Sequence, residues 1–214
     1  MRLYLSSYRL GNAPTTLRSL AGDGRRAGIC MNACDVFEDR RMVWPREQAD
    51  LEGLGFEVSE VDLRDHFVDR TGLRDQLMSI DLLWVVGGNT FTLARAMHAS
   101  AFATVGTDLV TAGRLTYAGY SAGVCVVTPD FEGIHLMDDP DALAPGYPAY
   151  ARPAALGWLP WRVVPHWDSD HKETETADLA VNYLLKAELP FRTLRDGHAI
   201  VVDKTETRLV GRSS

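Results

Sequence analysis

A serine flanked by two glycines is the residue best placed to do chemistry. Gly119, Ser121 and Gly123 form a G-x-S-x-G pattern within the run LTYAGYSAGVCVV. An apolar stretch precedes the serine and a run compatible with a helix follows it, so a sharp turn would lift the hydroxyl out of a sheet edge. The N–H of Ala122 would then face a developing oxyanion, helped by the dipole of the helix. The pattern predicts Ser121 as a nucleophile, with a plain strand-to-helix turn capped by serine as the alternative.

A second glycine turn lies upstream. The apolar run 82–86 leads into Gly87, Gly88 and Asn89, and a helical pattern follows. Such turns expose backbone N–H groups beside a helix N-terminus, where they can bind a phosphate or an oxyanion. The turn lacks the third glycine of a dinucleotide site and the lysine of a P-loop. Paired with the Ser121 turn, it predicts that Gly88 supplies a second oxyanion donor.

A serine nucleophile needs a base, and His166 is the first candidate. It follows an apolar strand in the sequence Val164-Pro165-His166-Trp167, and active sites of open α/β sheets gather at strand ends. His171, in the next loop, is the reserve. The acid that orients the base is ambiguous, because several carboxylates lie between the serine and the histidine, among them Asp130, Glu132, Asp138 and Asp139.

The elements that would position these residues have the α/β pattern, in which short apolar runs alternate with amphipathic stretches. Strands are predicted over 2–6, 26–31, 56–63, 82–86, 115–120, 161–164 and 199–202, and helices over 45–54, 90–97, 102–112 and 174–187. The segment 140–160 is rich in proline and glycine and is expected to be a long loop, which either lies beside the active site or is only a surface excursion. We predict one domain over 1–214, with a doubly wound, mostly parallel sheet and helices on both faces.

Composition narrows the setting. The chain has 214 residues and a formal net charge of −7, which disfavours nucleic acid and anionic membranes as partners. Its three cysteines do not form a disulfide or zinc pattern, so no metal is expected. The N-terminal run is too short and too polar for a signal peptide, and no apolar run approaches the ~20 residues of a membrane helix. The expected location is cytoplasmic.

Taken together, the motifs resemble the peptidase E family of serine peptidases. The matching elements are GGNTF at 87–91, GYSAG at 119–123, Thr128-Pro129, and PHW at 165–167, in the same order along the chain. The resemblance implies a fold similar to class I glutamine amidotransferases, with serine in place of their cysteine. It also implies a Ser–His–acid triad and oxyanion donors at Gly88 and Ala122. Known members cleave dipeptides with N-terminal aspartate, and the related cyanophycinases degrade an aspartate–arginine polymer.

The chain departs from this family at the acid. Aligned without gaps from Ser121, the usual aspartate falls on Leu136. Because some relatives use glutamate, Glu132 is the first choice and Asp138 the alternative. Lys204 and the short chain favour peptidase E over cyanophycinase, whereas the segment after the histidine lacks the usual arginine.

We therefore expect hydrolysis of Asp-X dipeptides through an acyl-enzyme. Asn89, His171 and Lys172 are the expected substrate-binding residues. No metal or organic cofactor is expected, the partner is a small peptide, and a homodimer is left open. Three rivals remain: a serine esterase with the same turn, a non-catalytic protein that binds a small anion, and an amidotransferase-like enzyme that uses Cys125.

Overall fold

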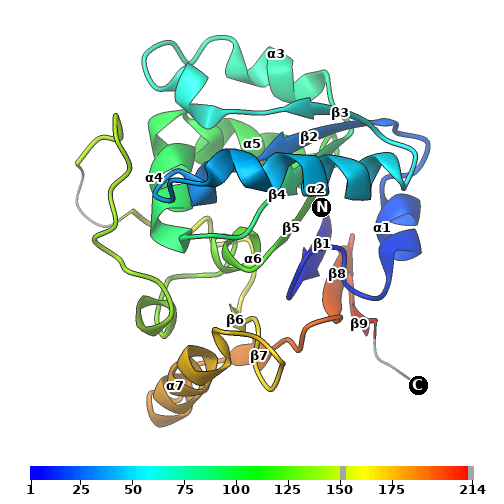
Figure 1. The fold of residues 1–214 in the computed structure, drawn as a ribbon. Helices are drawn as coiled ribbons and strands as arrows, with labels where there is room; N and C mark the ends of the chain where they lie inside the picture. Colours follow the sequence, from blue (N-terminus) through cyan, green and yellow to red (C-terminus); the bar gives the residue numbers. More distant parts are fainter. Residues whose placement is uncertain (150–152, 212–214) are drawn as a thin grey trace.

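The computed structural model describes residues 1–149 and 153–211, and its centre is a seven-stranded sheet (Figure 1). The strand order is β3-β2-β4-β5-β1-β8-β9. Five strands run parallel: β1 (Arg2–Ser6), β2 (Arg26–Cys30), β3 (Glu57–Glu60), β4 (Leu82–Val85) and β5 (Thr116–Tyr120). β8 (Ala199–Asp203) is antiparallel to β1, and β9 (Glu206–Val210) is antiparallel to β8. The predicted α/β class with a mostly parallel sheet is confirmed.

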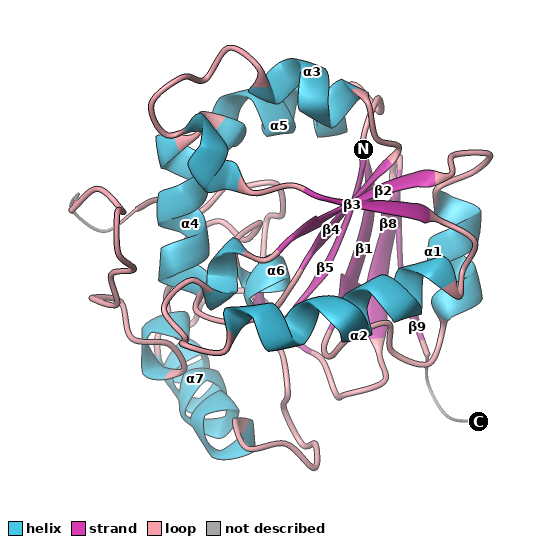
Figure 2. Ribbon diagram, turned by 45° about the horizontal axis from the view of Figure 1, so that its top comes forward, coloured by secondary structure: helices cyan, strands magenta, loops and turns pink. Residues whose placement is uncertain are grey.

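Helices cover both faces of this sheet (Figure 2). One face carries α1 (Pro14–Leu20) and α2 (Arg40–Glu52), and the other carries α3 (Leu73–Met78), α4 (Thr90–Ala99) and α5 (Phe102–Thr111). Alternate residues of each strand supply the two cores: Tyr4 and Trp84 pack towards α1 and α2, whereas Leu3 and Leu83 pack towards the other helices. Burial on both faces explains why the central strand β4, buried at every position, reads as a continuous apolar run. Within the described ranges, no helix combines the length and apolar character needed to cross a bilayer.

A smaller unit follows the loop 140–160. β6 (Arg162–Val164) pairs in parallel with β7 (Phe191–Thr193), and α7 (Thr174–Lys186) connects them. The predicted strand at 161–164 therefore forms, but it joins a two-stranded sheet outside the main one (Figure 1). The short helix α6 (Ala122–Cys125) follows β5 directly. Three 3₁₀ turns complete the described elements: η1 (Asn32–Cys34), η2 (Leu63–His66) and η3 (Ile134–Leu136).

Several elements differ from the sequence-based expectation. The short helices α1 and α3 and the strands β7 and β9 were not predicted. The helix predicted over 45–54 begins at Arg40 instead, with Pro45 in its interior. Proline lacks an N–H group, which made it read as a helix start, but the helix tolerates the loss of one backbone hydrogen bond there.

Hydrogen bonds anchor the loop 140–160 to the rest of the chain at several points. The Tyr147 hydroxyl donates to Asp35 at 2.5 Å, and the Trp158 N–H donates to the Val127 carbonyl at 2.9 Å. The described parts, 140–149 and 153–160, hold no helix or strand, and none of their residues lines the pocket that contains Ser121. Residues 150–152 of the predicted loop lie outside the described residues.

Candidate active site

Ser121 lies on a sharp turn between β5 and α6. Its φ is 50° and its ψ is −114°, a backbone conformation that is costly for a residue with a side chain. Its N–H donates to the Ser7 carbonyl at 3.2 Å, which fixes the turn to the end of β1. A Cβ atom on Gly119 or Gly123 would lie 2.7 or 2.5 Å from the Val85 carbonyl oxygen. The two glycines of the motif are therefore needed because the end of β4 passes close behind the turn.

The Ser121 side chain opens into a pocket of about 240 Å³ at the carboxyl ends of the parallel strands. Its lining includes Gly88, Ser121, Asp138, His166, His171 and Glu173. A larger hollow of about 650 Å³, beside Asp168 and Arg195, contains neither the serine nor His166. The smaller pocket is the candidate active site, because it brings together the predicted nucleophile and the predicted base.

His166 is almost fully buried and is held by a network of hydrogen bonds. Its Nδ1 lies 2.9 Å from Oδ1 of Asp196, and its backbone N–H donates to the Ser7 hydroxyl at 2.8 Å. The same hydroxyl donates to Asp196 at 2.7 Å. Burial raises the pKa of Asp196, but the hydrogen bonds from His166 and Ser7 outweigh it and hold that pKa below its ordinary value. A carboxylate only accepts hydrogen bonds, so Nδ1 carries the proton and Nε2 keeps a lone pair.

Ser121 and His166 both line the pocket but do not form a hydrogen bond with each other. Among the described residues, no hydrogen bond joins the Ser121 hydroxyl to the His166 ring. The nearest carboxylate to His166 Nε2 is that of Glu173, with Oε2 at 3.7 Å. In hydrolases without substrate, such contacts are often long and tighten only when substrate binds.

The structure does not bring the first-choice acid to the histidine. Glu132 accepts a hydrogen bond from the Tyr183 hydroxyl and makes no ion pair with His166. Asp130 pairs instead with Arg162. The carboxylate on His166 Nδ1 is Asp196, which sequence reasoning missed.

The alternative acid, Asp138, does line the pocket. It accepts the Thr90 N–H at 2.8 Å. Its pKa is raised to about 6, chiefly by burial and also by the charge of Glu173, because these effects outweigh the lowering by the Thr90 hydrogen bonds and by His166. Asp138 therefore lies near His166 electrostatically without orienting its ring through a hydrogen bond.

The position of Asp196 explains why it was overlooked. It follows β7 in the run Leu194-Arg195-Asp196-Gly197, 30 residues after the histidine, whereas the candidate acids named from the sequence lie between the serine and the histidine. A carboxylate just after the strand that pairs with the histidine's own strand was the available signal. It could not be used because β7 itself was not predicted.

The two predicted oxyanion donors, Gly88 and Ala122, lie on the tight turns that follow β4 and β5. Gly88 has a φ of 144°, and a Cβ atom there would lie 2.5 Å from the Ala33 carbonyl oxygen, so this position requires glycine. Within the described ranges, the N–H groups of Gly88 and Ala122 have no hydrogen-bond acceptor. Both are therefore free to donate to a substrate oxygen.

Among the predicted substrate-binding residues, the Asn89 side chain is occupied by hydrogen bonds within the protein. Its Oδ1 accepts the Thr92 N–H at 2.8 Å and caps α4, and its Nδ2 donates to the Asp139 carbonyl at 2.9 Å. Asn89 therefore shapes the glycine turn and does not line the pocket, whereas His171 and Lys172 do line it. Arg46 also lines it and was not predicted.

Three free cysteines are buried in the described part of the chain. Burial raises the pKa of Cys125 well above its ordinary value, and its thiol faces the Val163 carbonyl. A buried thiol of this kind is a poor nucleophile. The amidotransferase-like alternative at Cys125 therefore has no support in the geometry.

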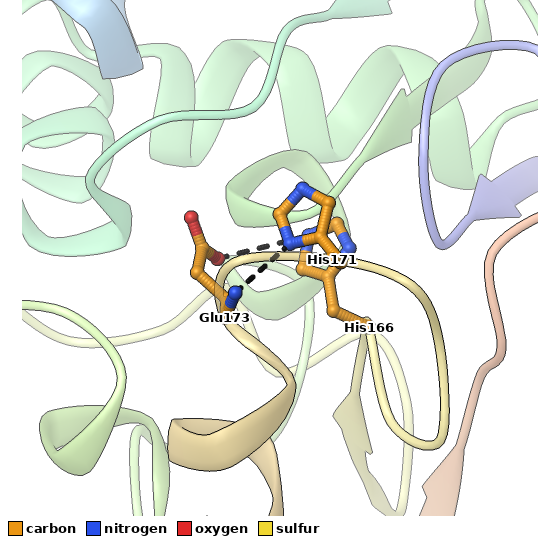
Figure 3. Close-up of side chains that lie close together, drawn as sticks. All are labelled: His166, His171 and Glu173. Carbon is orange, nitrogen blue, oxygen red and sulfur yellow. Dashed lines mark hydrogen bonds and ion pairs between the residues drawn. The ribbon is translucent and has the colours of Figure 1, made fainter.

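One group of side chains in the described ranges could hold a metal ion: His166, His171 and Glu173 (Figure 3). One ligand atom from each lies within 4.8 Å of the other two. The two imidazole rings are stacked, with their centroids 3.8 Å apart and their planes 8° from parallel. No metal is expected here from the sequence, because the ligands are not at the spacing of a known motif.

An α/β sheet with a serine on the strand-to-helix turn, a neighbouring histidine and free backbone N–H groups is the layout of serine hydrolases. The profile of peptidase family S51 matches residues 31–210, and the chain belongs to this family of serine peptidases.

Individual relatives agree with this family. The chain is 26% identical over 153 residues to an uncharacterized peptidase of Pasteurella multocida, covering 72% of this chain and 69% of the relative. It is 29% identical over 141 residues to a probable alpha-aspartyl dipeptidase of Drosophila melanogaster, covering 63% and 55%. The chain thus spans little more than half the length of the Drosophila relative.

The fold has a close counterpart among solved structures. A protein of Listeria monocytogenes EGD-e assigned to peptidase E superposes with a TM-score of 0.82 at 21% identity, covering 99% of this chain and 98% of that one. A peptidase from an acI-B1 actinobacterium superposes with a TM-score of 0.71 at 18% identity, covering 99% and 88%. At these identities the likeness concerns the fold.

Proposed function

We propose that the protein hydrolyses short peptides, chiefly dipeptides with N-terminal aspartate, through an acyl-enzyme on Ser121. One observation carries this proposal: Ser121, on its strained turn, shares a pocket with His166, whose Nδ1 is bonded to Asp196 at 2.9 Å. The Drosophila relative bears the name of an alpha-aspartyl dipeptidase, which suggests the substrate class.

In the proposed mechanism, the Ser121 hydroxyl attacks the scissile carbonyl carbon while His166 Nε2 takes its proton. The carbonyl oxygen becomes an oxyanion that accepts hydrogen bonds from the N–H groups of Gly88 and Ala122. His166 then donates its proton to the leaving amine. A water molecule next attacks the acyl-enzyme while His166 takes its proton, and His166 returns that proton to the Ser121 oxygen as the acid product leaves. We propose Asp196 as the third member of the triad, in place of Glu132 or Asp138.

The charges around the pocket fit an N-terminal aspartate. Such a substrate carries an ammonium group close to a side-chain carboxylate. Asp138 and Glu173 line the pocket and can pair with the ammonium, whereas Arg46 and Lys172 line it and can pair with the carboxylate. His171 lies with them and can add a hydrogen bond.

The proposed setting is the cytoplasm. The three cysteines of the described chain are free and buried, which fits a reducing compartment.

The test is cleavage of Asp-p-nitroanilide beside the Ala and Leu analogues, with Ser121→Ala as the control. We expect selective cleavage of the aspartyl compound, and its loss in the variant without a change in folding. Hydrolysis of p-nitrophenyl esters with no cleavage of any anilide or dipeptide would favour an esterase instead. Unchanged peptide cleavage by Ser121→Ala would refute the mechanism.

A further inference from the structure

The side chains of His166, His171 and Glu173 form a cluster that the hydrolytic mechanism does not fully use. The mechanism needs only Nε2 of His166, yet this atom faces Oε2 of Glu173 at 3.7 Å, and the His171 ring lies stacked against the same imidazole (Figure 3). Two imidazoles and one carboxylate are a ligand set that zinc accepts, with a fourth position left for water.

Hydrogen bonds leave His166 with a lone pair directed into the cluster. Asp196 binds Nδ1 of His166, so the free lone pair is on Nε2, the atom that faces Glu173. A carboxylate behind a ligating histidine is the usual outer shell of a zinc site, because it fixes the tautomer and the ring orientation. Nδ1 of His171 accepts the Glu173 N–H at 3.2 Å, so a metal can bind His171 only if this contact opens or the ring turns to present Nε2.

Hydrogen bonds between side-chain hydroxyls and backbone groups hold the turn that carries the three ligands. The Thr174 hydroxyl lies 3.0 Å from the His166 carbonyl and 2.6 Å from the Ser169 carbonyl. The Ser169 hydroxyl in turn accepts the Asp196 N–H at 2.8 Å. These contacts bring positions 166, 171 and 173 together before any ion binds, so little ordering remains to be done on binding.

The distances allow a metal after a small adjustment. Tetrahedral zinc, with Zn–N bonds near 2.0–2.1 Å, holds its ligand atoms about 3.3 Å apart. The three ligand atoms here lie within 4.8 Å of one another. His171 and Glu173 are only half-buried, so rotation of their side chains can close the difference.

The local charge also favours a cation. Three carboxylates gather around the cluster, from Asp138, Glu173 and Asp196. The nearest lysine, Lys172, is 85% exposed and lies at the 4.0 Å limit of an ion pair with Glu173. The other cation that lines the pocket, Arg46, pairs with Glu47 at 2.7 Å. A divalent ion would therefore be attracted by carboxylates that Lys172 and Arg46 balance only weakly.

We propose that His166, His171 and Glu173 bind a divalent transition-metal ion of the zinc type, and that this ion reversibly inhibits the peptidase. The inhibitory part rests on the proposed function of His166 as base. Nε2 of His166 has one lone pair, which can bind the metal or accept the Ser121 proton but cannot do both. The metal is an inhibitor in this proposal and takes no part in the hydrolysis.

Metal binding can be measured without any turnover. Metal-stripped Ser121→Ala protein, which retains all three ligands, is titrated with Co²⁺ and then with Zn²⁺. We expect one Co²⁺ per chain with the intense visible absorption of tetrahedral coordination, displaced by Zn²⁺.

Adding His171→Ala or Glu173→Gln to the Ser121→Ala protein should weaken metal binding by about tenfold or more, the size of effect seen when supporting groups of a metal site are lost. His98→Asn, away from the pocket, is the matched control and should bind as before. Absence of Co²⁺ binding, or binding that survives both ligand variants, would overturn the site.

Inhibition is then measured with the intact protein. Zn²⁺ should reduce cleavage of Asp-p-nitroanilide with an inhibition constant that matches the measured binding, and a chelator should restore activity. His171→Ala, referred to its own metal-free rate, should need about tenfold more Zn²⁺ for the same inhibition. A rate that rises with Zn²⁺ would overturn the inhibitory role. If no peptide is cleaved with or without metal, the proposed function and the inhibition resting on it fail, while the Co²⁺ titration still decides the site.

Discussion

Two aspartates in the candidate site experience opposite environments. Hydrogen bonds from His166 and Ser7 overcome burial and lower the pKa of Asp196, whereas burial raises the pKa of Asp138 to about 6. The first remains a carboxylate at neutral pH and can stabilise a charged imidazole. The second is poised to change its protonation near neutral pH. At the scale of single residues, this difference separates the proposed triad acid from a pocket-lining group.

The assignment of the acid can be tested by replacing each candidate with its amide. Asp196→Asn should lower kcat by about 10³–10⁴-fold, because an amide can stabilise the wrong tautomer of His166 and cannot stabilise its charged form. Glu132→Gln, whose carboxylate contacts Tyr183, is the matched control and should stay near the wild-type rate. Steady-state kinetics on Asp-p-nitroanilide provides the measurement. A large loss in Glu132→Gln with little change in Asp196→Asn would reverse the assignment.

Asp138 should make the stability of the fold depend on pH. Its pKa is raised from 3.8 to about 6 in the folded state, so the folded protein binds this proton more tightly than the unfolded chain does. Stability should therefore fall as pH rises from about 4 to about 6, by up to about 3 kcal/mol, and the deficit should persist above that window.

Asp138→Asn removes this titration while keeping an oxygen to accept the Thr90 N–H. Denaturant unfolding of both proteins should show the variant gaining stability relative to wild type between pH 4 and pH 7. An equal difference at both pH values would show that Asp138 is not protonated more readily in the folded state.

At the scale of elements, a buried carboxylate joins helix α2 to two strands. Glu47 is fully buried and accepts hydrogen bonds from Trp84 Nε1 on β4 at 2.8 Å and from the Tyr120 hydroxyl on β5 at 2.9 Å. Arg46, which lines the pocket, donates to the same carboxylate at 2.7 Å. Because Tyr120 directly precedes Ser121, this contact also fixes the approach to the serine turn.

Glu47→Ala should therefore destabilise the protein. It leaves the donors of Trp84 and Tyr120 unpaired in the interior, and each unpaired buried donor costs about 1–3 kcal/mol. Glu52→Ala, at an exposed position of the same helix, should change the free energy of unfolding far less. Urea denaturation of the two variants measures this free energy. Equal losses in Glu47→Ala and Glu52→Ala would show that the buried contacts of Glu47 contribute little to stability.

At the scale of the whole molecule, Ser7 holds three distant segments together. It follows β1, its hydroxyl accepts the His166 N–H and donates to Asp196, and its carbonyl accepts the Ser121 N–H. The partners lie 114 to 189 positions away in the chain. One buried serine thus connects the main sheet to the nucleophile turn and to the small sheet that carries the base.

Ser7→Ala should reduce both stability and activity. The backbone contact to Ser121 survives, but the His166 N–H loses its acceptor, which costs about 1–3 kcal/mol. The imidazole also becomes less well oriented, so kcat should fall more than KM changes. Ser6→Ala is the control, because its buried hydroxyl makes only long contacts of 3.3 and 3.5 Å. A Ser7→Ala enzyme with wild-type stability and kcat would refute this role.

The α/β class, most of the strands of the main sheet and the two glycine turns could be predicted from the amino-acid sequence. These features are local: apolar runs of strand length, glycines where a Cβ atom would lie only 2.5–2.8 Å from another chain segment, and a serine between strand and helix. The sequence also placed His166 at the end of its strand, where the structure brings it into the pocket of Ser121.

Which carboxylate forms the hydrogen bond with His166 depends on the tertiary structure. Asp196 reaches His166 because β7 pairs with β6 and because Ser7 bridges the two residues. No local pattern encodes that meeting, since pairing between short strands depends on the packing of the whole chain. The same holds for the cluster of His166, His171 and Glu173, which forms only because the following turn folds back over the histidine.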